Sequence, residues 1–439
     1  MFAAFIALLI AGTAYLHRIG LVGSGYISQM VCVEHFYNGR SADETRETFF
    51  GGYDSRLGLI SHNVDEAEKT VSAGIGPLGR SRAVFFDGFG CVIERGPLPD
   101  LPSLPSIEPS PLPIGNPEAL GFDERELNQA LDDIIGSKDG HSAILVMREG
   151  QIVAERYADG YDAAHVFPSA SMAKSVTATM IAAAIQDGLV DINNPAPIPE
   201  WSGEDDLRSQ ITWKHLLEMQ SGLEFGDGDY RDPFGNVPVM NVLKHSAAEF
   251  AINKPLLHEP GTVFEYSTGT SNILQHALRN ALEDEGLSYH QFGLNQIFEP
   301  LGMSSFMFVP DSAGDFIGGS TAYASAHDWA KLGQLYLQDG KWDGEQVLPE
   351  NWLEYVSTPN QHSDRAHSAQ IWLNLPGIDD REASFPSVPE DALMFWGHGG
   401  QFVVMIPSLD MLIVHLGWDP EMPMDKVFGR ILGSLEKNT

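Results

Sequence analysis

The sequence predicts an α+β fold built on one antiparallel sheet, with flanking helices and a helical insertion. Two β-rich runs flank Arg148-Glu149-Gly150, a pattern typical of a hairpin. The C-terminal part of the chain is again β-rich, and residues 407–410 form a turn signal between its last two runs. The stretch between these regions has mainly helical patterns. We therefore expect the two β regions to pair as one sheet, with the helical block inserted between them.

Composition and charge narrow the classes of function. The 439 residues are 43% hydrophobic and 20% charged, which is typical of a globular protein. Lys and Arg number 26 against 60 Asp and Glu, a formal net charge of −34. So acidic a chain argues against nucleic acid as a partner, and against electrostatic adhesion to anionic lipid. The charge serves either solubility or the attraction of cationic substrates.

Residues 1–27 are expected to be a hydrophobic signal or membrane anchor. The run from Met1 to Leu16 is uncharged, and His17 and Arg18 follow it. A helix that spans a bilayer needs about 20 residues, and this run is shorter. It also lacks the positively charged segment that normally begins a signal peptide. We expect an exported, periplasmic or membrane-anchored protein, with possible membrane attachment through residues 1–27. The alternative is an ordinary buried helix.

Three further segments are expected after residue 27. Residues 28–96 form an N-terminal segment, residues 97–117 a proline-rich linker, and residues 118–436 the main domain. The two cysteines, Cys32 and Cys91, both precede the linker, and they are either one disulfide or two free thiols. Without a C-x-x-C motif, a zinc knuckle or dithiol redox site is not expected.

Local signals give the order of elements in the main domain. Asp123 is expected as the N-cap of a helix that ends near residue 135. A longer helix begins at Ser171 and is closed by Gly188, and residues 263–266 (VFEY) predict a short strand. Further helices and strands are predicted for the ranges 213–222, 271–284 and 326–340 (helices) and 368–375, 392–396, 401–407 and 411–418 (strands).

The strongest chemical signal is Ser171-Met172-Ala173-Lys174 at the start of a helix. The i, i+3 spacing puts Ser171 and Lys174 on one face of the first turn. A serine hydroxyl becomes a good nucleophile only when a base accepts its proton, and a buried lysine amine can be that base. The helix N-terminus also offers the backbone N–H of Ser171 to an oxyanion. The alternative is a capping serine beside a solvated lysine.

Two later features add candidate residues. Tyr266 lies where the predicted strand meets the next helix, where a phenol can relay protons in a cleft. The run Trp396-Gly397-His398-Gly399-Gly400-Gln401 directly precedes a strand, and its glycines allow close approach of a ligand. His398 is a candidate donor, and the N–H of Gln401, after Gly400, is a candidate second oxyanion donor. Trp396 is a candidate substrate contact. The alternatives are a packing tyrosine and a structural, glycine-rich turn.

The loop 224–232 (EFGDGDYRD) is acidic and lies between the first two motifs. Asp229 and Tyr230 are candidate substrate-binding residues there, because the carboxylates of this loop suit a cationic end of a substrate. The alternatives are a solvated turn or a calcium-like loop that lacks the full ligand spacing.

These motifs, in this order, resemble the serine β-lactamase and penicillin-binding-protein superfamily. The similarity covers about residues 118–435 and is greatest to class C β-lactamases, family VIII carboxylesterases and 6-aminohexanoate-dimer hydrolases. It extends to ITWKHLLEMQSGLEF, FEPLGMSSF and DWAKLGQLYLQDGKWDGEQVLPENW. The resemblance implies a β-lactamase-like fold with an acylated Ser171, its base Lys174 and a proton-relaying Tyr266. It also places His398 where β-lactamases carry a lysine, and Gln401 at the second oxyanion N–H.

Two departures from the family pattern shape the expected function. The second motif reads Tyr266-Ser267-Thr268 where class C enzymes have Tyr-x-Asn, and His398 replaces a lysine that helps to hold the β-lactam carboxylate. We therefore expect a serine hydrolase for small-molecule esters or amides, with no metal or other cofactor. The alternatives are a D-amino-acid peptidase or weak β-lactamase on the same fold, and a binding protein without turnover.

Overall fold

The computed structural model describes residues 2–50, 55–137, 140–203, 205–228, 232–379, 381–419 and 421–436. It divides into two compact units. The first unit comprises residues 1–104, 225–254 and 307–317, and the second comprises 105–224, 255–306 and 318–439. The boundary at 104/105 lies inside the proline-rich segment 97–117. The two downstream pieces of the first unit come from the range expected to belong to the main domain.

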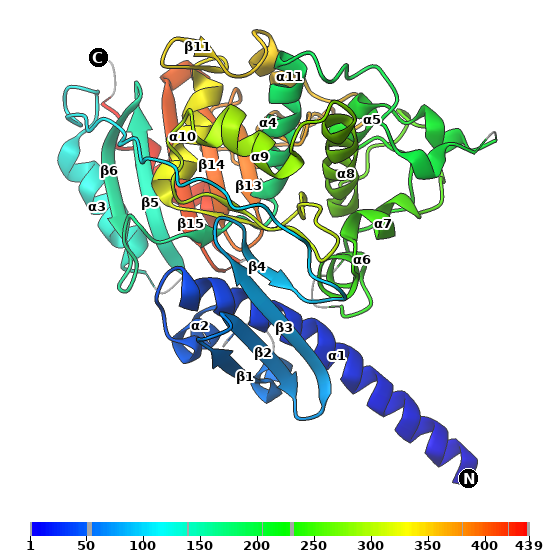
Figure 1. Ribbon diagram of the computed structural model, residues 1–439. Helices are drawn as coiled ribbons and strands as arrows, with labels where there is room; N and C mark the ends of the chain where they lie inside the picture. The colour runs from blue at the N-terminus through cyan, green and yellow to red at the C-terminus, as the bar shows by residue number, and fades with distance from the viewer. Residues whose placement is uncertain are drawn as a thin grey trace. The chain divides into compact units, whose positions relative to one another are not determined.

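The first unit is built on a long helix beside a four-stranded antiparallel sheet in the order β1-β2-β3-β4. The C-terminal part of α1, from about Ile19 onward, contacts β3 (Figure 1). A disulfide joins Cys32 of α1 to Cys91 of β4, so the thiols left open by the sequence are paired. The elements of this unit are α1 (Phe2–Phe36), α2 (Ala42–Phe50), η1 (Ser55–Leu59), β1 (Ser61–Asp65), β2 (Thr70–Ile75), β3 (Leu78–Phe86), β4 (Gly90–Ile93), α6 (Asn236–Pro238), η4 (Val239–Leu243), α7 (Ala247–Ile252) and β8 (Met307–Phe308).

Helix α1 is continuous through residue 27, where the expected signal or anchor ends. Ile19, Val22, Ile27 and Val31 are buried in the first unit, so this part of the helix belongs to a protein core. The helix is apolar nearly all round in this part, and such a helix is stable when it is buried. Among the described residues, no helix combines the length and the apolar character required to cross a membrane.

The second unit contains a six-stranded antiparallel sheet in the order β12-β13-β14-β15-β5-β6. Strand β15 from the C-terminal region pairs with β5 from the early hairpin, for example Val414 with Leu145. This pairing confirms the expected single sheet with a helical insertion. The strands are β5 (His141–Arg148), β6 (Gln151–Tyr157), β12 (Trp372–Leu373), β13 (Leu393–Gly397), β14 (Gln401–Ile406) and β15 (Met411–Gly417).

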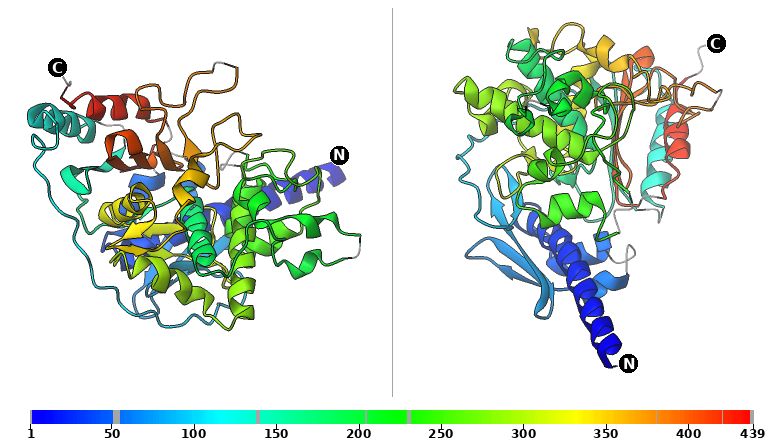
Figure 2. Two further views of the ribbon diagram at one scale, coloured as in Figure 1. Left: turned by 90° about the horizontal axis from the view of Figure 1, so that it is seen from above. Right: turned by 90° about the vertical axis from the view of Figure 1, so that its right-hand side faces the viewer.

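Helices cover both faces of this sheet. Helices α3 (Glu124–Ile135) and α12 (Met424–Leu432) lie together on one face, and α4 (Met172–Gln186) and α10 (Ala326–Leu337) on the other (Figure 2). Asp123 caps α3 by accepting a hydrogen bond from the N–H of Glu126, as expected. Side chains along β13, β14 and β15 alternate between the two faces of the sheet, so apolar residues reach both helical layers. Packing of α4 against one of these faces places its start beside the sheet.

The remaining elements of the second unit form the helical insertion and short connections. They are β7 (Phe167–Pro168), η2 (Pro199–Trp201), η3 (Leu207–Gln210), α5 (Trp213–Leu217), α8 (Thr268–Asp284), α9 (Tyr289–Gly293), η5 (Leu294–Phe298), β9 (Ala322–Ala324), β10 (Lys341–Trp342), β11 (Glu345–Gln346), α11 (Trp352–Ser357) and η6 (Pro407–Leu409).

Two strand predictions need correction. Residues 263–266 form no strand, although the N–H of Glu265 bonds to the carbonyl of Met219. The predicted strand 368–375 shrinks to the two residues of β12. Gln370 has a left-handed φ of 61°, and its side-chain amide donates to the carbonyls of Leu216 and Leu217. Such a backbone conformation ends a strand, which period-two patterning alone does not reveal.

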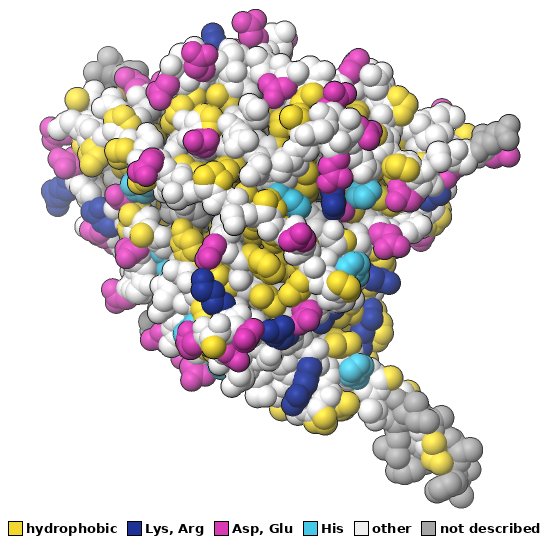
Figure 3. Space-filling model, in the orientation of Figure 1, with side chains coloured by type: hydrophobic (Ala, Val, Ile, Leu, Met, Phe, Trp, Pro, Cys, Tyr) yellow, Lys and Arg dark blue, Asp and Glu magenta, His cyan; other side chains and the backbone are white. Residues whose placement is uncertain are grey.

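The surface reflects the acidic composition. In the view of Figure 3, Asp and Glu side chains are spread over the visible face and Lys and Arg are sparse. The excess of acidic side chains on that face agrees with the charge of −34.

Candidate active site at the start of α4

Ser171 lies at the N-terminus of α4, directly after a residue with an uncommon backbone conformation. The preceding residue, Ala170, has a left-handed φ of 43°, which is uncommon for a residue with a Cβ. Strained backbone of this kind persists where the surrounding structure fixes it, often at active sites. Ser171 occupies the N-cap position, yet its side chain makes no capping hydrogen bond. Its hydroxyl is therefore not used to cap α4.

Lys174 lies one helical turn further along and is only 1% exposed. Its Nζ is 3.2 Å from Ser171 Oγ, 3.0 Å from Thr268 Oγ1 and 2.7 Å from the carbonyl oxygen of Gly319. The carbonyl can only accept a hydrogen bond, whereas each hydroxyl can either donate or accept. A neutral amine can therefore donate to Gly319 and Thr268 and direct its lone pair at the hydroxyl of Ser171.

Close backbone packing holds the acceptors of Lys174. A Cβ added at Gly319 would lie 2.5 Å from Cγ2 of Thr268, so only glycine fits there without movement. The N–H of Gly319 donates to Oδ1 of Asn272 on α8, which fixes the peptide that precedes its carbonyl. From the sequence, Thr268 was expected only as a departure from the family's asparagine and as a possible helix start, and Gly319 was not a candidate. In the sequence, Thr268 stands at the start of a helix and Gly319 belongs to a Gly-Gly pair. Both features are common in proteins and do not by themselves indicate an active site.

Tyr266 lies beside the lysine. The Nζ of Lys174 is 4.8 Å from the centroid of the Tyr266 ring, within the range of a cation–π contact. The ring also packs against Trp372, with centroids 5.1 Å apart, and against His367, 5.9 Å away. Ser171, Lys174 and Tyr266 are thus brought together around one buried amine.

His367 is a member of this group that the sequence did not reveal. Its side chain is only 1% exposed. Burial, together with the positive charge of Lys174, lowers the pKa of His367 to about 3. The imidazole is therefore neutral at ordinary pH and packs against Tyr266 and Trp372 as a ring.

The glycine-rich segment before β14 lies against the turn that precedes Ser171. A Cβ added at Gly397 would lie 2.3 Å from the carbonyl oxygen of Ser169 and 3.2 Å from Cβ of Ala170. The same position is 3.0 Å from Cβ of Gln401. The start of β14, with the candidate oxyanion donor Gln401, is consequently close to the start of α4.

The other residues of this segment have different surroundings. His398 is half-buried, with its ring 6.4 Å from that of Trp418 in an edge-on arrangement. Trp396 packs among the rings of Trp372, Phe385 and Phe402, next to the core below α3 and α12. Gly400 adopts a left-handed φ of 87° at the turn.

The acidic loop 224–232 is described only in part. Asp229 and Tyr230 lie outside the described residues. Residue 224 belongs to the second unit and residue 225 to the first. Within the described part of the chain, no group of three or more His, Cys, Asp or Glu side chains is arranged to hold a metal ion.

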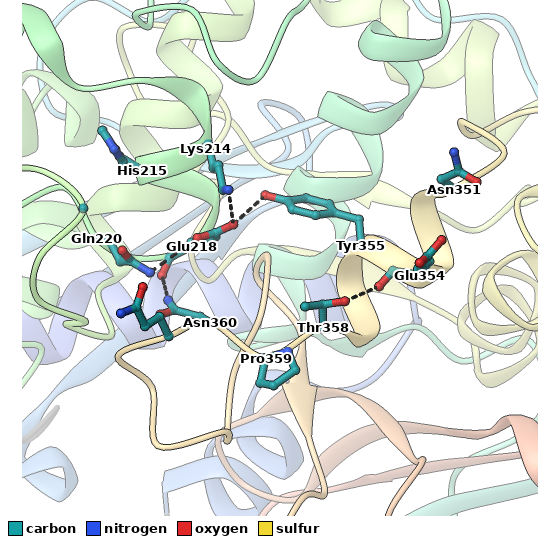
Figure 4. A pocket seen from close by; sticks show the side chains of 12 residues that line it. Lys214, His215, Glu218, Gln220, Asn351, Glu354, Tyr355, Thr358, Pro359 and Asn360 are labelled. Carbon is teal, nitrogen blue, oxygen red and sulfur yellow. Dashed lines mark hydrogen bonds and ion pairs between the residues drawn. The ribbon is translucent and has the colours of Figure 1, made fainter. Parts of the chain in front are cut away.

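A cavity of about 600 Å³ lies elsewhere in the second unit, between α5 and α11 (Figure 4). Glu218 faces it and accepts a hydrogen bond from the hydroxyl of Tyr355, while Lys214 lies 3.8 Å away. Burial raises the pKa of Glu218. Ser171, Lys174 and Tyr266 are not among the residues that line this cavity, so it is separate from the lysine site.

Comparisons with known proteins assign the fold and the family. A 6-aminohexanoate-dimer hydrolase of Paenarthrobacter ureafaciens is 24% identical over 259 residues, or 56% of this chain. The alignment spans only 62% of that relative's length. A solved Bacillus anthracis structure, provisionally described as a 6-aminohexanoate-dimer hydrolase, matches with a TM-score of 0.60 at 21% identity, covering 75% of this chain and 89% of that one. A family VIII carboxylesterase matches with a TM-score of 0.53 at 15% identity, covering 71% and 97%.

The two solved structures show a shared fold, since their sequence identities are low. The model of the family described as "Beta-lactamase" matches residues 132–420, well over half of the chain, and this range includes Ser171, Lys174, Tyr266 and Gln401. The chain therefore belongs to the β-lactamase family.

Proposed function

We propose that this protein cleaves ester or amide bonds through an acyl-enzyme formed on Ser171. One observation supports the proposal above all. The amine of a lysine that is 1% exposed lies 3.2 Å from the Ser171 hydroxyl, and its other contacts include the acceptors Thr268 and Gly319. A base that is buried and already within hydrogen-bond distance is what an unactivated serine requires.

In acylation, the neutral amine of Lys174 takes the proton of the Ser171 hydroxyl. The oxygen then attacks the substrate carbonyl and forms a tetrahedral intermediate. Collapse of this intermediate breaks the ester or amide bond, and the leaving oxygen or nitrogen receives a proton. Tyr266 is suited to relay that proton, because its ring lies 4.8 Å from the amine that holds it.

In deacylation, the same groups act on water. Lys174 and Tyr266 take a proton from the water as it attacks the acyl carbonyl, and Ser171 leaves with a proton. The free carboxylic acid is released and the enzyme returns to its starting state. The backbone N–H of Ser171, at the N-terminus of α4, donates to the oxyanion in both steps, and removing such a donor costs about 3–4 kcal/mol in other hydrolases. Gln401 is paired with Gly397 in the sheet, so its N–H is not counted as a second donor.

The substrate class follows from the departures in the motifs and from the relatives. Thr268 and His398 stand where β-lactamases have an asparagine and a lysine that contact the antibiotic. The relatives include a protein named 6-aminohexanoate-dimer hydrolase and a carboxylesterase. We therefore propose linear esters or amides, rather than β-lactams, as the preferred substrates.

The test uses two serines of the same helix. Ser171→Ala removes the proposed nucleophile, whereas Ser175→Ala removes a buried hydroxyl one turn on that donates to the carbonyl of Gln370. Purified variants are assayed with p-nitrophenyl esters, aminohexanoate dimer, a D-Ala-D-Ala peptide and nitrocefin, and are labelled with a fluorophosphonate. We expect Ser171→Ala to lose labelling and at least about 10⁴-fold in kcat, and Ser175→Ala to keep both.

The outcomes separate the proposal from its rivals. Faster turnover of the D-Ala-D-Ala peptide or of nitrocefin than of every ester and amide would replace the proposed substrate class. Absence of turnover and of labelling in the folded wild-type protein would favour a binding protein. Activity that persists in Ser171→Ala would assign the chemistry to another residue.

A further inference from the structure

Three aromatic rings follow one another along the edge of the six-stranded sheet, and we call them the aromatic row (Tyr266, Trp372 and Trp396). The centroid of the Trp372 ring, on β12, is 5.1 Å from that of Tyr266 and 5.1 Å from that of Trp396, on β13. Strand β12 is the edge strand, and its pairing with β13 ends at Met394. Trp372 lies opposite Met394 and Trp396 two residues after it, so both indoles are on one face of the sheet.

The core fixes one side of the aromatic row. Trp372 and Trp396 pack against the apolar core below α3 and α12, and Trp396 also stacks on Phe402 at a centroid distance of 5.3 Å. This packing covers only part of the rings, because Tyr266, Trp372 and Trp396 are all half-buried. Rings that are held by a core and partly exposed beside a reactive group are suited to bind an apolar part of a ligand.

His367 lies behind the row and adds no charge to it. Its ring centroid is 5.1 Å from that of Trp372 and 5.9 Å from that of Tyr266. Burial, together with Lys174, lowers the pKa of His367 to about 3, so this imidazole is neutral at ordinary pH. The two indoles do not ionise. An apolar group can therefore cover this surface without burying an unpaired ion.

The place of Tyr266 indicates which part of the substrate meets the row. The Nζ of Lys174 is 4.8 Å from the centroid of the Tyr266 ring, and in the proposed reaction Tyr266 relays a proton to the leaving oxygen or nitrogen. The group attached to that atom must then extend past Tyr266. Trp372 and Trp396 continue from this ring, so they lie where the alcohol or amine portion of the substrate passes.

We propose that Trp372 and Trp396, together with Tyr266, bind the leaving group of the substrate and select apolar alkyl or aryl groups there. The inference rests on the proposed function, because the leaving group is defined by that reaction. Trp396 was a candidate substrate contact from the sequence, and Trp372 joins it. Neither indole moves a proton, so both determine specificity and leave the chemistry to other residues.

Acetate esters of ethanol, butanol and hexanol test this, with hydrolysis followed by titration of the released acid. The acyl group is constant and the three alcohols differ little as leaving groups, so kcat/KM reports how the alkyl chain is bound during acylation. Full burial of one methylene is worth about fourfold in affinity, and a row that covers one side should give about twofold. We expect kcat/KM to rise about 10- to 20-fold from ethyl to hexyl acetate.

Variants of the tryptophans locate the effect. Trp372→Ala should reduce the ratio of kcat/KM between the hexyl and ethyl esters to about threefold or less, and Trp396→Ala should affect the hexyl ester more than the butyl ester. Trp342→Ala, which removes a half-buried tryptophan of β10, should keep the wild-type ratio. The ratio is decisive because a displaced Tyr266 would slow all the esters equally and leave it unchanged.

A measurement on the wild-type protein keeps the inference testable if the alanine variants do not fold. Free 1-hexanol should inhibit the hydrolysis of p-nitrophenyl acetate at a lower concentration than 1-butanol, and 1-butanol at a lower concentration than ethanol. Ethyl acetate, ethyl butanoate and ethyl hexanoate vary the acyl chain instead. Along this second series kcat/KM should rise less than along the first.

The outcomes separate this inference from the proposed function. Equal kcat/KM for ethyl and hexyl acetate, or an unchanged ratio in Trp372→Ala, overturns the inference while leaving the acyl-enzyme intact. A steeper rise along the acyl series than along the alcohol series also overturns it, because the apolar subsite would then bind the acyl group. A folded wild-type protein without esterase or amidase activity overturns both.

Discussion

Two lysines in the second unit are equally buried but have different partners. Lys174 on α4 is 1% exposed and Lys331 on α10 is 3% exposed. Lys331 lies 2.8 Å from the carboxylate of Asp328, which also accepts hydrogen bonds from the backbone and hydroxyl of Ser305. The contacts of Lys174 include two hydroxyls, those of Ser171 and Thr268, and the carbonyl of Gly319.

The difference explains how one residue type serves two purposes. A carboxylate at 2.8 Å stabilises the ammonium form of Lys331, and an ammonium has no lone pair to accept a proton. Hydroxyls and a carbonyl stabilise an ammonium less, and one of these hydroxyls belongs to the proposed nucleophile. A lysine buried beside a carboxylate is thus expected to stabilise the fold, whereas a lysine buried beside a serine hydroxyl is suited to act as a base.

The largest expected effect is on Lys174. Lys174→Met keeps the length and apolar stem of the side chain and removes the amine. We expect kcat for an ester substrate to fall about 10²- to 10⁴-fold, the usual contribution of a general base. The midpoint of thermal unfolding should change little or rise, because the variant no longer buries a polar amine.

The comparison fails if Lys174→Met retains the wild-type kcat, or if it unfolds at the assay temperature. The first result would show that another group accepts the proton of Ser171. The second would show that Lys174 is needed for the fold as Lys331 is. Circular dichroism before each assay separates the two.

The second effect is on stability and concerns Lys331. Lys331→Met leaves Asp328 buried without its cation, and breaking a buried pair in this way costs about 3–5 kcal/mol. We expect urea denaturation to show this loss, while kcat of the folded enzyme stays within about threefold of wild type. A large loss of kcat without loss of stability would contradict the distinction between the two lysines. The double variant of Lys331→Met with Asp328→Leu should recover part of the stability.

The sequence was sufficient for the parts of the fold that have local patterns. Alternation around Arg148-Glu149-Gly150 predicted the β5–β6 hairpin, and the spacing after Ser171 predicted α4. It was not sufficient for the first unit, where the N–H of Arg95 donates to Ser312 and its guanidinium to the carbonyl of Val242. Contacts between residues so far apart in the chain leave no periodicity to detect. The Cys32–Cys91 disulfide was undecided for the same reason.

The candidate site divides in the same way. Ser171 and Lys174 could be identified because their relation is a spacing within one helix. His367 and Trp372 could not, since each is a single residue in a run of ordinary composition. Their place beside Lys174 and Tyr266 depends on how segments far apart in the chain pack. The roles of all these candidates remain predictions, and Asp229 and Tyr230 also lie outside the described residues.

The smallest effect is a titration that reports the charge of Lys174. Burial is the main cause that lowers the pKa of His367 to about 3, and Lys174 lowers it further. Lys174→Met should therefore raise the pKa of His367, although burial keeps it below the ordinary 6.5. Lys331→Met should leave it unchanged. NMR titration of the histidine ring signals measures this, with His367→Phe to assign the resonance.

The same shift has a consequence for stability whose sign is fixed. The unfolded chain binds a proton at His367 below about pH 6.5, whereas the folded protein does so only near pH 3. His367 therefore makes the free energy of unfolding fall as the pH drops from 6.5 towards 3. The total fall should be smaller in Lys174→Met than in wild type, because the folded pKa is then closer to the unfolded one and the fall ends at a higher pH. An identical total fall in both proteins would mean that Lys174 carries no charge there in the resting enzyme, and the amine would already be the free base that the acylation step requires.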